Sequence, residues 1–142
     1  MANIVELREM SDAKLEEMLE NSREEMFNLR FQRASAQLED YSRIKAVRRE
    51  IAQLETVLNM RQLAIETAVA DPTVAAALAG EEWQGSANYS YEESGWQVTF
   101  ANGSGKELAT ALVNLNKKRP HSRRQAKKVR QSQRVVSAEV AG

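Results

Sequence analysis

Basic side chains are concentrated at two places in this chain of 142 residues, and both concentrations are suited to binding a polyanion. The first group consists of six cations that flank residues 35–41: Arg30, Arg33, Arg43, Lys45, Arg48 and Arg49. Such a group can displace counterions from several phosphates, which is the main sequence-independent source of affinity for RNA. Arginine suits this task because its planar guanidinium can hold one phosphate through two N–H donors. The same charges are also compatible with a solvated helix pair that carries ordinary surface ion pairs.

The second basic group lies in the C-terminal part of the chain. It contains Lys117, Lys118, Arg119, Arg123, Arg124, Lys127, Lys128 and Arg130. Few large apolar side chains accompany these cations, so we expect residues 117–142 to be disordered until a partner binds. Unfolded basic segments of this type bind phosphates between RNA helices, and we predict this use here. The alternative is a tail that only raises solubility.

The sequence shows no arrangement of residues suited to catalysis or to metal binding. The one histidine, His121, lies in the basic segment, whereas acid–base catalysis needs a positioned partner. Residues 102–106 (NGSGK) resemble a phosphate-binding loop but lack its spacing. The chain has no cysteine for a disulfide or a thiolate metal site. We therefore expect no enzyme, cofactor, metal or small-molecule substrate, and residues 67–142 offer little core for a dry active site.

A formal net charge of zero hides a strong segregation of charge along the chain. Residues 1–27 carry 3 basic and 8 acidic residues, and residues 28–66 carry 7 basic and 5 acidic residues. Residues 67–105 contain 5 acids and no Lys or Arg, whereas residues 106–142 contain 10 basic and 2 acidic residues. Such segregation indicates a partner surface or a tail. No apolar run approaches the roughly 20 residues that span a bilayer, and the N-terminal residues do not resemble a signal peptide. We expect a cytoplasmic protein without a membrane partner.

Two helices are predicted to position the first basic group. Ser11 or Asp12 can cap the first helix, and the chain breaks at residues 35–41. The apolar residues recur at steps of three and four: Leu15, Leu19, Met26, Phe27, Leu29 and Phe31 in the first helix, and Ile44, Val47, Ile51, Leu54 and Leu58 in the second. Because the connection is short, we predict an antiparallel two-helix hairpin over residues 1–66. The alternative is a free coiled-coil module, in which the apolar row of the second helix packs against the same row of another chain.

A different pattern follows the hairpin. Residues 67–82 are predicted to be a linker with a short Ala-rich helix, because Asp71-Pro72 favours a turn. Alternating residues on both sides of a turn then predict a β-hairpin: Tyr89, Tyr91, Trp96, Val98 and Phe100. A helix is predicted over residues 107–116 from the spacing of Leu108, Ala111, Leu112 and Leu115. Residues 83–116 are therefore expected to form a small ββα unit.

The predicted fold class is mainly α: a two-helix hairpin, a small ββα extension and a basic tail. The expected domain boundaries are 1–66, 67–82, 83–116 and 117–142. The aromatic residues of the extension could stack on bases, but their alternation favours the core of a small sheet. Because acidic residues surround these aromatic residues, the surface of this unit is poorly suited to binding RNA. The alternative is that it contacts a neighbouring protein.

Several blocks of the first half, in order and with matching spacing, resemble the large-subunit ribosomal protein L29 family. These blocks are residues 6–12 (ELREMSD), 27–32 (FNLRFQ), 37–39 (QLE) and 43–58 (RIKAVRREIAQLETVL). The resemblance covers roughly residues 4–66. Where members often have Asn-Pro at the start of the second helix, this chain has Asp40-Tyr41, and Ala36 stands where a turn glycine is common. Early lysines are missing, and residues 67–142 have no recognised counterpart.

The resemblance implies a helical hairpin on the large ribosomal subunit, near the exit of the nascent-chain tunnel. It implies as partners the large-subunit ribosomal RNA, neighbouring ribosomal proteins and factors that meet nascent chains, and a ribosomal location in the cytoplasm. Six residues match the family's basic positions and are expected to bind RNA: Arg8, Arg30, Arg43, Lys45, Arg48 and Arg49. Among them, Arg30, Arg48 and Arg49 are the strongest candidates.

Overall fold

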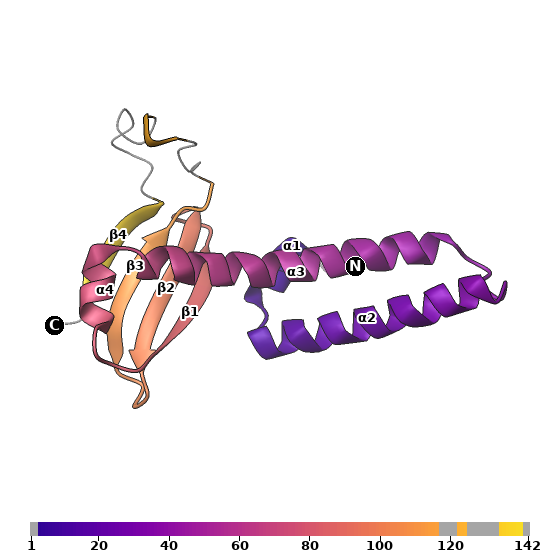
Figure 1. Ribbon diagram of the computed structural model, residues 1–142, viewed down its shortest axis with the longest axis horizontal. Helices are drawn as coiled ribbons and strands as arrows, with labels where there is room; N and C mark the ends of the chain where they lie inside the picture. The colour runs from indigo at the N-terminus through magenta and orange to yellow at the C-terminus, as the bar shows by residue number, and fades with distance from the viewer. Residues whose placement is uncertain (1–2, 117–121, 125–133, 141–142) are drawn as a thin grey trace. The chain divides into compact units, whose positions relative to one another are not determined.

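The computed structural model describes residues 3–116, 122–124 and 134–140 (Figure 1). The helices are α1 (Ile4–Glu9), α2 (Asp12–Ala34), α3 (Ser42–Val69) and α4 (Pro72–Leu78), and the strands are β1 (Trp83–Ser90), β2 (Gly95–Asn102), β3 (Glu107–Val113) and β4 (Val135–Val140). The chain forms two compact units, Met1–Asn59 and Met60–Gly142, and α3 contributes to both. In the described part of the chain, no helix combines the length and apolar character needed to cross a membrane.

The first unit is the predicted antiparallel hairpin. The hydroxyl of Ser11 accepts a hydrogen bond from the Lys14 amide at 3.3 Å and caps α2, as one of the two expected caps. The seam between α2 and α3 is buried in two clusters: Leu15 and Leu19 with Leu54 and Val57, and Met26 and Leu29 with Ile44 and Val47. Because this seam is closed within one chain, the row in α3 is not free to pair between chains, which argues against the coiled-coil module.

Two phenylalanines do not belong to this seam, although their spacing in the sequence predicted that they would. The side chains of Phe27 and Phe31 are 68% and 66% exposed. The buried row of α2 runs through Leu19, Ser22 and Met26, and a residue one position after Met26 points well away from that row.

The turn that ends α2 is non-helical, as predicted. The Ala36 amide donates to the Arg33 carbonyl at 3.2 Å and the Gln37 amide donates to the Gln32 carbonyl at 2.9 Å. These two bonds form a Schellman motif, which requires a left-handed residue, and Ala36 has a φ of 56°. Further along, the Asp40 carboxylate accepts hydrogen bonds from the Ser42 amide and hydroxyl, which lower the pKa of Asp40. Asp40 therefore supports the start of α3.

A short helix that was not predicted, α1, closes the other end of the hairpin. At its start the Asn3 amide donates to a Glu6 carboxylate oxygen at 3.4 Å. Its Leu7 side chain is 2% exposed and packs in the cluster of Leu15 and Leu54. This packing explains why so short a helix persists, since isolated helices of this length are unstable in water.

The second unit contains a four-stranded antiparallel sheet in the order β1-β2-β3-β4. The predicted β-hairpin is confirmed, with Tyr89 opposite Trp96 and Ser90 opposite Gly95. The predicted helix over residues 107–116 is wrong, because β3 occupies most of it and buries Ala109, Ala111 and Val113 in alternation. The ββα prediction is therefore corrected to a sheet of four strands.

The expected disorder from residue 117 onward is also wrong over residues 135–140, which form β4 and pair with β3. The short Ala-rich helix predicted in the linker corresponds to α4, whose Asp71 cap accepts from the Thr73 amide at 2.9 Å.

The core of the second unit lies on one face of the sheet. The end of α3 and α4 lie over this face (Figure 1), and their side chains pack with Trp96, Val98 and Phe100. The helical members of this cluster are Ala64, Ile65, Ala68, Val69, Val74, Ala77 and Leu78. Trp96 and Phe100 are buried in this core and Tyr89 packs against it, as predicted, whereas Trp83 and Tyr91 are exposed. Trp83 makes an edge-to-face contact with Phe100 at a ring distance of 5.3 Å.

Candidate nucleic-acid interface

Two ion pairs between α2 and α3 establish which side of the hairpin each basic residue occupies. Arg23 Nη2 lies 3.0 Å from Glu55 Oε1. Residues three or four positions apart share a helix face, so the row of Arg23 continues to Phe27 and then Arg30. On α3 the row of Glu55 runs back through residue 52 to Arg48 and Lys45. Because Arg23 and Glu55 meet, both rows lie on the same side of the hairpin.

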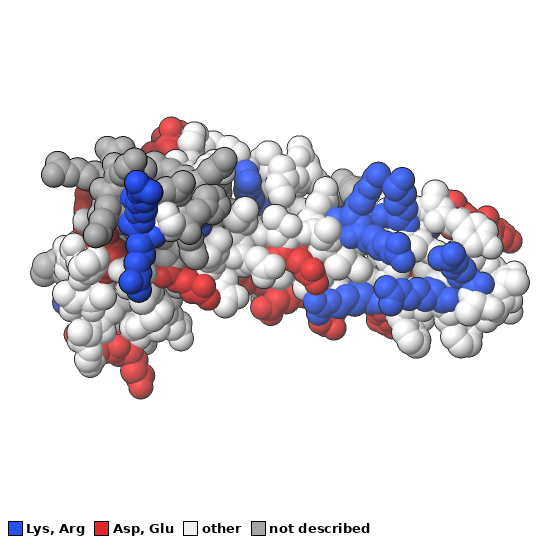
Figure 2. Space-filling model, turned by 45° about the horizontal axis from the view of Figure 1, so that its top comes forward, with Lys and Arg blue, Asp and Glu red and all other residues white. Residues whose placement is uncertain are grey.

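We define the cationic face by the basic residues of these rows and by Arg49, which lies one turn beyond Lys45: Arg23, Arg30, Lys45, Arg48 and Arg49. Figure 2 shows blue side chains gathered over α2 and α3 on one face of the hairpin. Arg30, Lys45, Arg48 and Arg49 are all exposed, and their side chains make no ion pair or hydrogen bond with the described residues. Their N–H donors therefore remain available to a ligand.

Arg43 lies on the other side of the hairpin and is already paired. Its Nε and Nη2 donate to the two carboxylate oxygens of Glu25 at 2.5 and 2.9 Å. The hydrogen bonds with Glu25 raise the pKa of Arg43 above its ordinary value. A guanidinium held in this way by a carboxylate offers a phosphate less charge and fewer donors than Arg48 does.

The remaining predicted residues of the first half occupy other positions. Arg33 follows Leu29 by four residues, so it continues the buried row past the end of the seam, and it is exposed. Arg8 lies on α1, whose Leu7 packs at the end of the hairpin away from the turn, and it is half-buried. The structure therefore groups Arg30, Lys45, Arg48 and Arg49 on one face, whereas Arg8, Arg33 and Arg43 lie elsewhere.

The second basic group is described only in part. Arg123 and Arg124 are exposed. The other predicted residues of this group lie outside the described residues: Lys117, Lys118, Arg119, Lys127 and Lys128. The predicted role of the whole group stays a prediction.

Arg23 as a surface cation of the hairpin, and the exposure of Phe27, were not predicted from the sequence. Arg23 bonds to Glu20 as well as Glu55, with distances of 3.2 and 3.0 Å. Both residues could have been assigned to an outer face by counting three- and four-residue steps from the buried row of Leu15 and Leu19. The pairing of Arg23 with a residue of α3 could not have been found without the fold.

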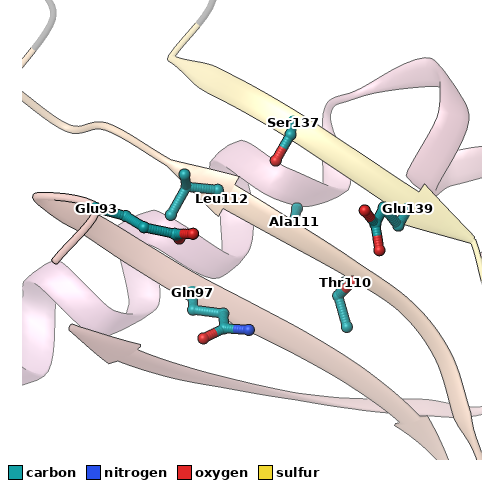
Figure 3. Close-up of a pocket in the computed structure, with 7 residues that line it drawn as sticks. All are labelled: Glu93, Gln97, Thr110, Ala111, Leu112, Ser137 and Glu139. Carbon is teal, nitrogen blue, oxygen red and sulfur yellow. The ribbon is translucent and has the colours of Figure 1, made fainter. Parts of the chain in front are cut away.

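The open face of the sheet carries a shallow pocket of about 130 Å³ (Figure 3). Its lining consists of Glu93, Gln97, Thr110, Ala111, Leu112, Ser137 and Glu139. It combines one amide, two hydroxyls and two carboxylates with the apolar side chains of Ala111 and Leu112. Lacking cations, this lining is unsuited to phosphate.

The region that matches a known family lies almost entirely in the first unit. A family model described as "Ribosomal L29 protein" matches residues 5–61. The protein named "Large ribosomal subunit protein uL29" of Streptomyces avermitilis is 52% identical over 62 residues, which is 44% of this chain and 84% of that relative. The proteins of the same name from Streptomyces coelicolor and Mycobacterium tuberculosis are 50% and 52% identical over 62 residues, which cover 84% and 80% of those relatives.

Proposed function

Because the chain belongs to the ribosomal L29 protein family, we propose that it is a structural constituent of the large ribosomal subunit and binds the large-subunit ribosomal RNA through the cationic face. The observation that carries this proposal is a set of exposed cations that have no ion pair or hydrogen bond with the described residues: Arg30, Lys45, Arg48 and Arg49. Each such cation that binds a phosphate releases a counterion, so affinity should fall steeply as salt rises. The proposed role is structural and not enzymatic.

The proposal includes a location and further partners. The resemblance to the family supports a position near the nascent-chain exit of cytoplasmic ribosomes, beside a neighbouring large-subunit protein. Factors that meet nascent chains would then be partners at the same place. The second basic group, including Arg123 and Arg124, would add phosphate contacts of its own.

The proposal is tested with the double variant Arg48→Glu/Arg49→Glu. Both side chains are exposed, so the hairpin should fold and keep its helical circular dichroism. Binding is measured by co-sedimentation with large subunits depleted of their own L29 protein, over a series of salt concentrations. We expect binding of the variant to be weaker and less dependent on salt, because two phosphate contacts become repulsive.

A matched control separates the effect of position from that of net charge. Lys14→Glu/Lys106→Glu reverses two exposed cations outside the cationic face, and Lys14 makes only a surface ion pair with Glu17. This control should bind as the unaltered chain does. Normal co-sedimentation of the Arg48/Arg49 variant would show that the proposed surface does not hold the RNA.

A further inference from the structure

The strongest unexplained feature of the hairpin is an exposed aromatic pair on α2. Phe27 and Phe31 are 68% and 66% exposed, although burial of a phenylalanine side chain is favourable. They lie four residues apart, so their rings are neighbours on the outer surface of the helix. Neither ring contributes to the seam of the hairpin, because the buried residues of α2 are Leu15, Leu19, Ser22, Met26 and Leu29.

The pair lies among the cations of the face that is proposed to bind RNA. Phe27 stands between Arg23 and Arg30 in one row of α2, and Phe31 adjoins that row. Across the hairpin, on the same side, the row of α3 carries Arg48 and Lys45. Aromatic rings interleaved with cations are typical of surfaces that bind unpaired nucleotides, where the cations hold phosphates and the rings stack on bases.

We propose that Phe27 and Phe31 stack on unpaired bases of the ribosomal RNA whose phosphates the cationic face binds. This inference rests on the proposed function and adds which part of the RNA is recognised. An apolar groove on a protein partner fits the observations less well, because it would have to bury Arg30 beside the rings, and an unpaired buried charge is costly. A nucleotide provides a flat apolar base together with the anion that Arg30 and Arg48 need.

The test compares two double variants that separate stacking from general apolar contact. Phe27→Leu/Phe31→Leu keeps apolar surface and helix propensity but removes the rings, whereas Phe27→Tyr/Phe31→Tyr keeps the rings. Affinity for large subunits depleted of their own L29 protein is measured at several salt concentrations. We expect the leucine variant to bind about fivefold to 150-fold more weakly, with an unchanged salt slope, and the tyrosine variant to bind normally.

Ultraviolet crosslinking of the full chain to the same subunits, followed by mass spectrometry, provides a second measurement. It should join Phe27 or Phe31 to an RNA base. Tyr91→Leu is the matched control for the affinity measurement. Tyr91 is a 51% exposed aromatic residue, but it lies beside Glu92 and Glu93 rather than among cations. Its substitution should leave the affinity for the depleted subunits unchanged.

The outcomes distinguish this inference from the proposed function. Full affinity of the leucine variant, or crosslinks to a ribosomal protein instead of RNA, would overturn stacking while leaving the cationic face intact. If the unaltered chain failed to bind depleted subunits at any salt concentration, the proposed function would fail, and the stacking inference would fail with it.

Discussion

Ala36 adopts a backbone conformation that is unfavourable for alanine. Its φ of 56° lies in the left-handed region, which costs an L-residue with a Cβ about 1–2 kcal/mol. Glycine adopts it freely but loses more chain entropy on folding, so the two effects partly cancel. We expect Ala36→Gly to raise the free energy of unfolding by about 0.5–1 kcal/mol, measured by urea denaturation followed through helical circular dichroism.

The control for this variant is Ala34→Gly, two residues earlier and still within α2. Glycine has a lower helix propensity than alanine by about 1 kcal/mol, and by somewhat less near a helix end. This variant should therefore lower the free energy of unfolding. If both variants destabilised the hairpin equally, the left-handed turn at Ala36 would be the wrong explanation.

Arg43 and Arg48 show how far single residues can be assigned from sequence. Both belong to one basic run, and their immediate neighbours do not distinguish them. Glu25, which pairs with Arg43, lies 18 residues earlier in the chain. Only the antiparallel packing of α2 against α3 brings the two together, so the sequence could predict a basic surface but not which of its cations are already neutralised.

At the scale of elements, Gly85 determines how closely α3 can approach the sheet. A Cβ on Gly85 would lie 3.0 Å from Ile65 Cγ2 and 3.2 Å from a ring carbon of Phe100. Both neighbours belong to the packed core of the second unit, so neither can move freely. We expect Gly85→Ala to destabilise this unit by about 1–3 kcal/mol.

Denaturation followed by tryptophan fluorescence measures this effect, because both tryptophans, Trp83 and Trp96, lie in the sheet. Gly103→Ala serves as the control, since a Cβ there has nothing within 4 Å. This substitution should change the free energy of unfolding little, or raise it by about 0.4–1 kcal/mol, because alanine lowers the conformational entropy of the unfolded chain. A Gly85→Ala variant as stable as this control would contradict the close approach.

The two helices of the hairpin were predictable because each carries a long periodic row and a short turn joins them. The strand β3 was not, because its local signals conflict. Leu108 and Leu112 have helical spacing, whereas the buried residues Ala109, Ala111 and Val113 occupy every second position, as in a strand. Alanine gives little signal for either structure, so pairing with β2 and β4 decides the outcome. Such long-range partners are not visible in a short window of sequence.

At the scale of the whole molecule, the chain is a family hairpin with an added sheet unit. The family model matches residues 5–61, and the first compact unit ends at Asn59. The helix α3 continues past both limits to Val69, and its last turns supply Ala64 and Ala68 to the core of the sheet. The last turns of the second helix of the hairpin thus belong to the sheet unit. Its neutral and acidic open face is chemically distinct from the cationic face.

Charge segregation along the whole chain leads to the last prediction, which concerns the second basic group. Seven of its residues are replaced by glutamine: Lys117, Lys118, Arg119, Arg123, Arg124, Lys127 and Lys128. Each phosphate contact contributes about 0.9 to the slope of log affinity against log salt concentration. If all seven cations bind phosphates of the large subunit, the slope measured with depleted subunits should fall by up to about 6.

The control neutralises four acids of the sheet unit, Glu81, Glu82, Glu92 and Glu93, by substitution with glutamine. It shifts net charge by four without removing any cation. The slope should then stay near that of the unaltered chain, because counterion release depends on contacts rather than on net charge. A tail variant with an unchanged slope would mean that the second basic group only raises solubility, and that the hairpin alone supplies the phosphate contacts.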